Sequence, residues 1–260
     1  MTLNLRIGKY TDVGHYRENN EDKVEVKQLL TAQGDPFTVC IVADGMGGQA
    51  AGETASRIAT ETIPRELQNS LAGVQSEEDI YEALRSAAMT ANREIISMGD
   101  LDRDFRNMGT TIVVSLWMRS LREDHLYLAS LGDSRAYRLR GGELEQLTTD
   151  HSIAQALVEA KTISASEARS HRFRNILWKF LGSREMGENG PDVRTVDLQP
   201  GDVFLLCTDG VSGVLSDEDM KHILASEPDP DLCAQRLCQQ ALEAGSRDNV
   251  TSLVIAVEQS

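Results

Sequence analysis

The sequence lacks several features that would assign it to common classes of protein. It contains no run of eighteen apolar residues and no charged segment followed by an apolar leader. We therefore expect neither a membrane span nor a secretory signal, and we take the cytoplasm as the expected compartment. Lys and Arg number 26 against 41 Asp and Glu, a formal net charge of −15. This deficit of positive charge argues against nucleic acid as the main partner.

Cysteine and histidine are also scarce. The four cysteines have neither a disulfide-framework nor a zinc-ligand spacing, and Cys40 and Cys207 lie in apolar, strand-like runs. We expect reduced thiols in the core. No cysteine has an arginine six positions further on, so the C-x5-R loop of thiol-based phosphatases is absent. The five histidines include no close pair, which argues against an imidazole-rich zinc site.

One glycine-rich segment imitates a nucleotide-binding motif. Residues 45–50, GMGGQA, fit the pattern G-x-G-x-x-A. Asp44 directly before this segment would face a bound pyrophosphate, and the next apolar segments predict helices rather than the returning strand of a βαβ unit. No Gly-Lys-Ser/Thr follows, so the segment is not a P-loop either. The glycines therefore need another explanation.

The pattern of the chain predicts an α+β sandwich. Its 260 residues, 40% of them apolar, suit a single domain over residues 1–260 with a sizeable core. Strands and helices occur in blocks rather than in strict alternation, which indicates antiparallel sheets with helices on their outer faces. The expected strands are 23–29, 37–43, 110–118, 125–131, 135–140, 143–148, 202–207 and 250–257.

Helices are expected between the second and third of these strands and again near 216–226 and 229–244. The clearest one begins at Ser76, which has the character of a helix cap, and its apolar residues repeat along one face. Residues 98–109 and 183–192 are expected to form exposed loops.

Aspartates recur at the ends of the expected strands. Asp44 and Asp209 each follow an apolar run and begin the pattern Asp-Gly-x-x-Gly, Asp133 follows a third run, and Asp248 comes just before the last one. In antiparallel neighbours the end of one strand and the start of the next lie at the same sheet edge, so we expect these carboxylates to converge. For any single aspartate, a turn-forming role is the alternative.

A cluster of carboxylates needs compensation. Two such charges 4 Å apart repel each other by about 4 kcal/mol at an effective dielectric constant of 20. Clustering therefore predicts bound cations or raised pKa values, and oxygen ligands favour Mg²⁺ or Mn²⁺. Gly45 has no Cβ, so its backbone can approach an ion closely and its carbonyl can serve as a ligand.

A charged segment near the N-terminus adds candidate residues. Arg17 presents a planar fork suited to phosphate, and Glu21 and Asp22 can orient metal-bound waters. A merely solvated loop is the alternative interpretation of this segment.

Taken together, these segments resemble the metal-dependent serine/threonine protein phosphatases of type 2C, bacterial branch. The resemblance rests on GHYRENNED, VADGMGG, NMGTT, LGDSRAYRLR, LTTDHS, LLCTDG and SRDNVT, in this order, and spans Thr11 to Val257. It implies a four-layer α/β/β/α sandwich of two antiparallel sheets flanked by helices. It also implies hydrolysis of phosphoserine and phosphothreonine by direct attack of a metal-bridging hydroxide. The alternatives are a catalytically silent binding module of the same fold and a small-molecule phosphomonoesterase.

The resemblance further implies the ligands of two tightly bound Mn²⁺ or Mg²⁺ ions and of a looser third ion. Asp44, Asp209 and Asp248 would hold one ion, and Asp44 with the Gly45 carbonyl would hold the second. Asp133 with Asp209 would hold the third, as in bacterial members of the family.

Other roles are implied for residues around these ligands. Arg17 would grip the substrate phosphate and, with Asp44 and Asp209, forms the expected catalytic set, while Glu21 and Asp22 would act on the metal ions through water or neighbouring ligands. Met46 stands where eukaryotic members carry a histidine proposed as the leaving-group acid. His151 is interpreted as a structural histidine capping its turn, with proton donation as the alternative.

Residues 153–190 correspond to the variable flap of the family, a segment beside the site. Arg169, Arg172, Arg174 and Lys179 could there meet acidic or phosphorylated protein segments, and a solvated helix face is the alternative. The expected partners are phosphorylated proteins, including a cognate Ser/Thr kinase.

Overall fold

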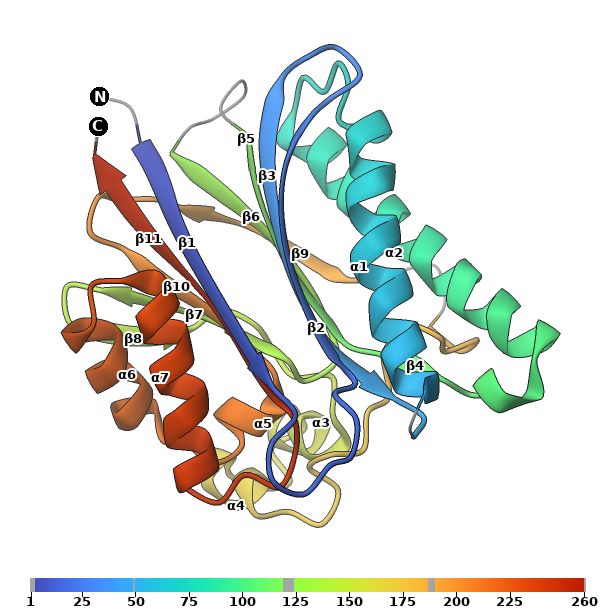
Figure 1. Cartoon of the computed structure of the whole chain (residues 1–260), viewed down its shortest axis with the longest axis vertical. Helices are drawn as coiled ribbons and strands as arrows, with labels where there is room; N and C mark the ends of the chain where they lie inside the picture. Colours follow the sequence, from blue (N-terminus) through green and yellow to red (C-terminus); the bar gives the residue numbers. More distant parts are fainter. Residues whose placement is uncertain (1–2, 49, 119–123, 187–189, 260) are drawn as a thin grey trace.

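The protein is a four-layer sandwich of two stacked antiparallel sheets with helices on both outer faces (Figure 1). The computed structural model describes residues 3–48, 50–118, 124–186 and 190–259. This architecture confirms the predicted α+β class and the order α/β/β/α.

The first sheet has the strand order β1, β11, β10, β7, β8, and every neighbouring pair is antiparallel. Its strands are β1 (Leu3–Asp12), β7 (Arg135–Arg140), β8 (Glu143–Gln146), β10 (Val203–Cys207) and β11 (Val250–Gln259).

The second sheet has the order β2, β3, β5, β6, β9, with β4 paired to the end of β3. Its strands are β2 (Asp22–Leu30), β3 (Pro36–Met46), β4 (Gly109–Thr110), β5 (Ile112–Met118), β6 (His125–Leu131) and β9 (Asp192–Asp197). The helices are α1 (Ala50–Ser70), α2 (Glu77–Leu101), α3 (Ile153–Glu159), α4 (Ala165–Arg169), α5 (Asp209–Ser212), α6 (Asp217–Ser226) and α7 (Pro230–Glu243).

Three clusters of buried apolar side chains fill the three spaces between the layers. Strand β3 contributes to two of them: Phe37, Val39 and Ile41 face α1 and α2, whereas Cys40 and Val42 face the other sheet. This division follows from the two-residue period of a strand. It explains why β3 is apolar on both sides although its sheet is antiparallel.

Helix α2 begins where the sequence predicts. The Ser76 hydroxyl accepts a hydrogen bond from the Asp79 N–H, and the Asp79 carboxylate accepts one from the Ser76 N–H, which completes a capping box. Such a cap satisfies two backbone N–H groups that the helix itself cannot. The buried face of α2 consists of Ile80, Ala83, Leu84, Ala87, Ala88, Ala91, Asn92 and Ile95.

Two strands lie outside the predicted set. Strand β1 pairs with β11 over its whole length, and its alternating Leu3, Leu5 and Ile7 join the cluster between the sheets. Strand β9 is a short edge strand beside β6. It begins at Asp192, within the predicted loop 183–192, of which residues 187–189 lie outside the described part of the chain.

Two predicted boundaries are also corrected. Residues 98–109 are not simply a loop, because α2 continues to Leu101 and a 3-10 turn follows at Arg103–Phe105. Strand β3 does not end before Asp44 but continues to Met46, because Gly45 pairs with Thr110 of β4.

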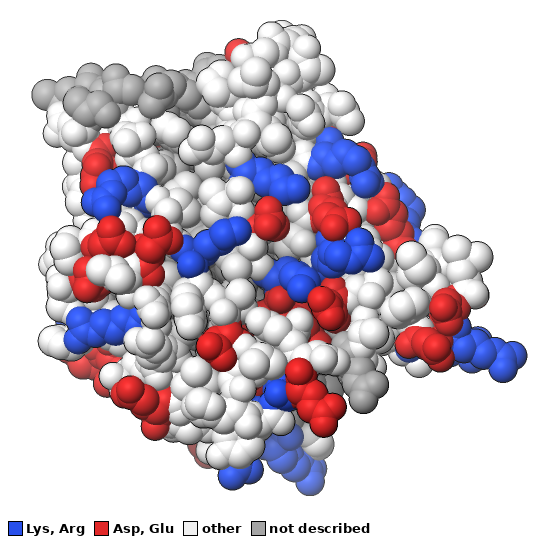
Figure 2. Space-filling model, viewed as in Figure 1, with Lys and Arg blue, Asp and Glu red and all other residues white. Residues whose placement is uncertain are grey.

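The molecular surface carries both signs of charge. Figure 2 shows acidic and basic side chains intermixed over one face rather than gathered by sign. Exposed ion pairs join neighbouring elements, such as Arg6 with Asp229 at 3.3 Å and Lys23 with Glu53 at 3.1 Å. No helix within the described residues is long and apolar enough to cross a membrane.

Candidate metal centre

Four aspartates lie at the same end of the two sheets. Asp44 is near the end of β3, Asp133 follows β6, Asp209 begins α5 directly after β10, and Asp248 precedes β11. In Figure 1 this end lies at the bottom, close to α3 and α5. The folded chain thus brings together, from both sheets, the carboxylates that the sequence singles out.

The aspartates interact strongly with one another. Burial, and then the charges of Asp22, Asp209, Asp133 and Asp248, raise the pKa of Asp44 well above its ordinary value. Burial and the charge of Asp248 also raise the pKa of Asp209, while a hydrogen bond between the side chains of Asp44 and Asp209 opposes this rise. The carboxyl groups of the two sheets therefore act on one another's protonation.

Burial differs within the group. Asp44, Asp133, Asp209 and Asp248 are half-buried and keep part of their surface open to solvent, whereas Asp22 is only 2% exposed. Burial, together with neighbouring carboxylates, raises the pKa of Asp133 to about 8 and that of Asp22 to about 7. Since ionised carboxylates so close together repel one another, this cluster favours protons or cations as partners.

Gly45 lies in a tight contact between β2 and α1. Its N–H donates to the Glu21 carbonyl at 3.2 Å. A Cβ added at Gly45 would lie 2.1 Å from the Gly52 carbonyl oxygen, and one added at Gly52 would lie 2.8 Å from both the Gly45 oxygen and Cδ of Glu21. The absence of side chains thus lets the Gly45 carbonyl and the Glu21 carboxylate meet at the first turn of α1.

Glu21 carries an unsatisfied atom at this point. Its Oε1 is buried and has no hydrogen-bond partner among the described residues, and burial raises the pKa of its carboxyl group. A buried acceptor without a donor is destabilising by about 1–3 kcal/mol. A cation, or a water bound to one, would satisfy it.

Arg17 lies at the rim of the cluster. Its Nη2 donates to Oδ2 of Asp248 at 2.7 Å, and 48% of its side chain is exposed. Asn249 fixes the loop that carries Arg17, because its amide accepts from the Glu21 N–H at 2.8 Å and donates to two carbonyl oxygens of this loop. The guanidinium is therefore held beside the aspartates and remains open to solvent.

Hydroxyl groups that the sequence analysis missed support the aspartates. Thr208 and Thr251 both donate to Oδ2 of Asp22, at 2.9 and 2.7 Å. Thr110 donates through its hydroxyl to the Asp44 carbonyl at 2.9 Å. These threonines lie within the segments NMGTT, LLCTDG and SRDNVT, and Thr208 directly precedes Asp209; this is the signal that could have identified them.

Thr111 connects two of the aspartate-bearing segments. Its hydroxyl oxygen accepts from the Asp44 N–H at 3.0 Å and lies 2.6 Å from Oγ of Ser134, the residue after Asp133. Thr111 is 1% exposed and Ser134 is 2% exposed. Asp44 and Asp133 are therefore positioned through one shared buried contact.

His151 has a structural role, as interpreted. It is 3% exposed, its Nδ1 accepts from the Gly132 N–H at 3.1 Å, and its Nε2 lies 3.2 Å from the Asp192 carboxylate. Both ring nitrogens are thus engaged, and the alternative of proton donation to a leaving group is not supported. Met46 lies in β3, paired with Gly109.

The expected flap contributes unevenly to the site. Residues 153–190, of which 187–189 are not described, contain α3 and α4. The charge of Arg174 opposes the rise in the pKa of Asp209. Arg169 pairs with Asp217 at 3.1 Å, both exposed.

The remaining cations of the flap do not all face solvent. Arg172 lies over the Phe173 ring, 4.4 Å from its centroid. Lys179 is 7% exposed and bonded to Asp192 at 2.8 Å. The prediction that Lys179 meets protein partners is therefore wrong, because its ammonium group is held inside the molecule.

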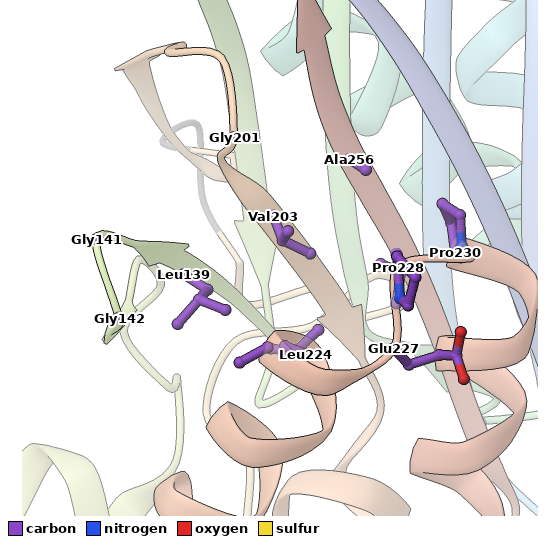
Figure 3. Close-up of a pocket in the computed structure, with 12 residues that line it drawn as sticks. Leu139, Gly141, Gly142, Gly201, Val203, Leu224, Glu227, Pro228, Pro230 and Ala256 are labelled. Carbon is purple, nitrogen blue, oxygen red and sulfur yellow. The ribbon is translucent and has the colours of Figure 1, made fainter.

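A hollow of about 300 Å³ lies at the opposite end of the first sheet (Figure 3). Leu139, Val203 and Val254 form part of its wall. Among the described residues that line it, Glu227 carries the only charge. This hollow is separate from the carboxylate cluster. Leu139 lies near the end of β7, whereas Asp133 precedes that strand, and Val203 begins β10, whereas Asp209 follows that strand.

The donor set determines which ion would fit. The cluster offers carboxylate and carbonyl oxygens, which suit Mg²⁺ or Mn²⁺ rather than a thiolate- or imidazole-bound metal. Within the described residues, no group of three or more His, Cys, Asp or Glu side chains already has the spacing of a complete metal cage. The orphaned Glu21 oxygen and the repelling aspartates nevertheless fit a divalent cation.

Fold and site together define a two-sheet α+β sandwich with a carboxylate cluster, flanked by an arginine, at one edge. Residues 15–245 match the model of the family described as protein phosphatase 2C. The chain therefore belongs to the protein phosphatase 2C family.

Individual relatives agree with this assignment. The chain is 34% identical over 245 residues to the serine/threonine phosphatase stp of Listeria monocytogenes, covering 94% of this chain and 93% of the relative. It is 35% identical over 257 residues to the serine/threonine protein phosphatase PstP of Mycobacterium tuberculosis, covering 99% of this chain. The chain spans 46% of the length of that relative.

The fold agrees with a solved structure. The catalytic domain of PstP, determined in complex with two manganese ions, superimposes with a TM-score of 0.81 at 33% identity, over 99% of this chain and 100% of that one.

Proposed function

We propose that the chain is a metal-dependent protein-serine/threonine phosphatase that hydrolyses phosphoserine and phosphothreonine. The observation that carries this proposal is the convergence of Asp44, Asp133, Asp209 and Asp248 beside Arg17 at one sheet edge. Membership of the protein phosphatase 2C family and the names of its relatives support it.

The proposed metal ligands are those of the cluster. Asp44, Asp209 and Asp248 are proposed for one Mn²⁺ or Mg²⁺ ion, and Asp44 with the Gly45 carbonyl for a second. Asp133 with Asp209 is proposed for a looser third. The structure of PstP with two manganese ions supports the choice of metal. Bound ions of this kind activate water and stabilise the charge that develops on phosphoryl oxygens.

The chain's own residues bind and orient the substrate. Arg17 is proposed to bind the phosphate through its guanidinium fork, because a charge-assisted bidentate contact fixes both distance and direction. Its contact with Asp248 holds it against the cluster, so a phosphate bound there would lie beside the aspartates. Glu21 and Asp22 are proposed to hold the ligands and their waters in place.

The remaining parts of the proposal concern partners and location. Phosphorylated proteins are proposed as substrates, with a cognate Ser/Thr kinase among them. Arg174 of the flap, whose charge acts on Asp209, is proposed to attract acidic or phosphorylated segments. A cytoplasmic location is included because all four cysteines are buried free thiols, as expected in a reducing compartment.

The test is phosphate release from a phosphothreonine peptide. We expect release with Mn²⁺, and loss of release after addition of a chelator or in Asp209→Asn. Asp104→Asn, which removes an exposed carboxylate outside the cluster, serves as the matched control and should retain activity. Activity that survives both the chelator and Asp209→Asn would contradict the metal-dependent function.

A comparison of substrates and a measurement of phosphopeptide binding separate the two alternatives. Faster release from sugar phosphates than from phosphopeptides would identify a small-molecule phosphomonoesterase. Binding of the phosphopeptide without release, in the presence of Mn²⁺, would identify a silent binding module.

A further inference from the structure

A series of hydrogen bonds runs from the flap, through the exposed Asp192 and the buried His151, to the loop that carries Asp133. Its centre is His151, which is held to the Gly132 backbone twice: the His151 N–H donates to the Gly132 carbonyl at 2.8 Å, and Nδ1 accepts from the Gly132 N–H at 3.1 Å. Since a backbone N–H can only donate, Nδ1 carries no proton in this arrangement. The proton of the neutral ring is then on Nε2.

The other ring nitrogen faces the start of β9. Nε2 lies 3.2 Å from Oδ2 of Asp192, and Oδ1 of Asp192 accepts from Nζ of Lys179 at 2.8 Å. The two bonds engage different oxygens of one carboxylate. They hold the pKa of Asp192 below its ordinary value, with the bond to His151 the larger cause. The charged carboxylate thereby fixes the Nε2–H form of the ring.

Lys179 belongs to residues 178–181 of the flap, which contact the site at several points. The Trp178 N–H donates to the His151 carbonyl at 3.0 Å, and the two rings meet edge to face with 5.3 Å between their centroids. Leu181 exchanges two backbone hydrogen bonds of 2.9 Å with Thr110. Residues 178–181 of the flap therefore contact both His151 and Thr110, whose hydroxyl donates to the Asp44 carbonyl.

The backbone conformation at Gly132 is tightly constrained, so the hydrogen bonds with His151 affect the orientation of the peptide before Asp133. Gly132 has a φ of 101°, a conformation that residues with side chains rarely adopt. A Cβ there would lie 2.5 Å from the Thr111 side chain. The peptide before Asp133 is thus held between Thr111 and His151, and its orientation sets the direction of the Asp133 side chain.

We propose that His151 is a positioning residue that couples the flap to Asp133: Lys179 and Asp192 fix the ring, and the ring fixes the backbone of Gly132. A change in the flap would then alter binding of the ion proposed at Asp133 while leaving the ions at Asp44 less affected. This inference deepens the proposed function and rests on it.

Two variants of His151 separate positioning from mere packing. His151→Asn places an amide oxygen near the position of Nδ1, so it keeps an acceptor for Gly132 and loses the bond to Asp192. His151→Gln places its amide near Nε2, so it keeps the bond to Asp192 and loses the acceptor. Both replace the ring by a smaller neutral amide, and circular dichroism with thermal unfolding would show whether each variant is folded.

The primary measurement is Mn²⁺ binding by calorimetry on the full chain, without substrate. We expect His151→Gln to weaken the loosest ion by about tenfold or more, in the range measured when partners of metal ligands are removed. His151→Asn should retain most of that affinity, and the tighter ions should change little in both. Equal affinities of wild type and His151→Gln, or equal losses in both variants, would overturn the proposal.

A variant on the flap side tests the coupling itself. Lys179→Met removes the ammonium group that bonds Asp192 but leaves His151 in place, and Arg169→Met removes an exposed flap cation that pairs with Asp217 instead. We expect weaker binding of the loosest ion in Lys179→Met and unchanged binding in Arg169→Met. Unchanged binding of the loosest ion in a folded Lys179→Met would contradict the coupling, even if His151→Gln did not fold.

A spectroscopic measurement tests the tautomer directly. Nitrogen-15 chemical shifts of the His151 ring should show an unprotonated Nδ1 and a protonated Nε2. The reverse pattern would contradict the hydrogen bonds from Gly132 to His151 and from His151 to Asp192. These outcomes differ from those expected if the proposed function is wrong. If the protein is not a metal-dependent phosphatase, the wild type would neither bind Mn²⁺ nor release phosphate. If only the coupling through His151 is wrong, the wild type would still do both.

Discussion

Replacing Asp22 by asparagine is expected to stabilise the metal-free protein by an amount that depends on pH. Asp22 is 2% exposed, and its Oδ2 accepts hydrogen bonds from Thr208 and Thr251. Burial raises the pKa of Asp22, and the charges of Asp209 and Asp248 raise it further. Asparagine retains an oxygen for the threonines but carries no charge. The variant therefore removes the electrostatic repulsion and keeps the hydrogen bonds.

The magnitude and its sign follow from the pKa of Asp22. Burial, opposed by the two threonine bonds, raises this pKa from 3.8 to about 7. The folded state thus binds this proton more tightly than the unfolded state, so the contribution of Asp22 to the free energy of unfolding falls as pH rises from 3.8 to about 7 and levels off above. A difference of one in pKa corresponds to about 1.4 kcal/mol, so the loss from Asp22 reaches about 4 kcal/mol.

The assay is urea unfolding of chelator-treated protein between pH 4 and pH 8. Asp22→Asn should be more stable than wild type by several kcal/mol at pH 8, and the difference should shrink toward zero near pH 4. Asp104→Asn, an exposed control, should show no comparable change with pH. A metal-free Asp22→Asn protein that is less stable than wild type at pH 8, or a gain that does not change with pH, would refute the electrostatic reasoning.

Two further predictions concern arginines. Arg17→Ala should raise KM for a phosphopeptide by about 10- to 100-fold, because hydrogen bonds to charged groups contribute about 1.5–3 kcal/mol; an unchanged KM in steady-state kinetics would remove Arg17 from phosphate binding. Arg140 makes a bidentate pair with Asp202, at 2.7 and 2.6 Å, and Asp202 is 1% exposed. Arg140→Ala should lower the free energy of unfolding by about 3 kcal/mol, since it leaves a buried carboxylate unpaired, and a loss below about 1 kcal/mol in urea unfolding would speak against that assignment.

The sequence predicts the layers and the main candidate residues because both depend on local patterns. Alternation within β3 and the cap at Ser76 are readable over a few residues, and they locate the strand that leads to Asp44 and the start of α2. Antiparallel pairing brings the aspartates to one edge within each sheet, whereas their convergence across the two sheets depends on how the sheets stack. Strand β1 escapes prediction although its apolar residues alternate, and β9 escapes because a short, polar edge strand has little pattern of its own.

The contacts that support the site could not be predicted in this way. Thr251 and Asp22 are far apart in the sequence, yet they share a buried hydrogen bond. Lys179 looks like a surface cation in the sequence, but Asp192 of a different segment holds it inside. Such pairings depend on which strands become neighbours, and a single chain's local pattern does not contain that information.

The strand-end aspartates are proposed to form one cation site in which Asp44 is shared. Calorimetric titration of the full chain with Mn²⁺ measures how many ions this site holds. Wild type is expected to bind at least two ions, in line with the two manganese ions in the structure of the catalytic domain of PstP, and Asp44→Asn is expected to lose both tightly bound ions together. Binding of two ions by Asp44→Asn with wild-type affinity would show that Asp44 is not shared between them.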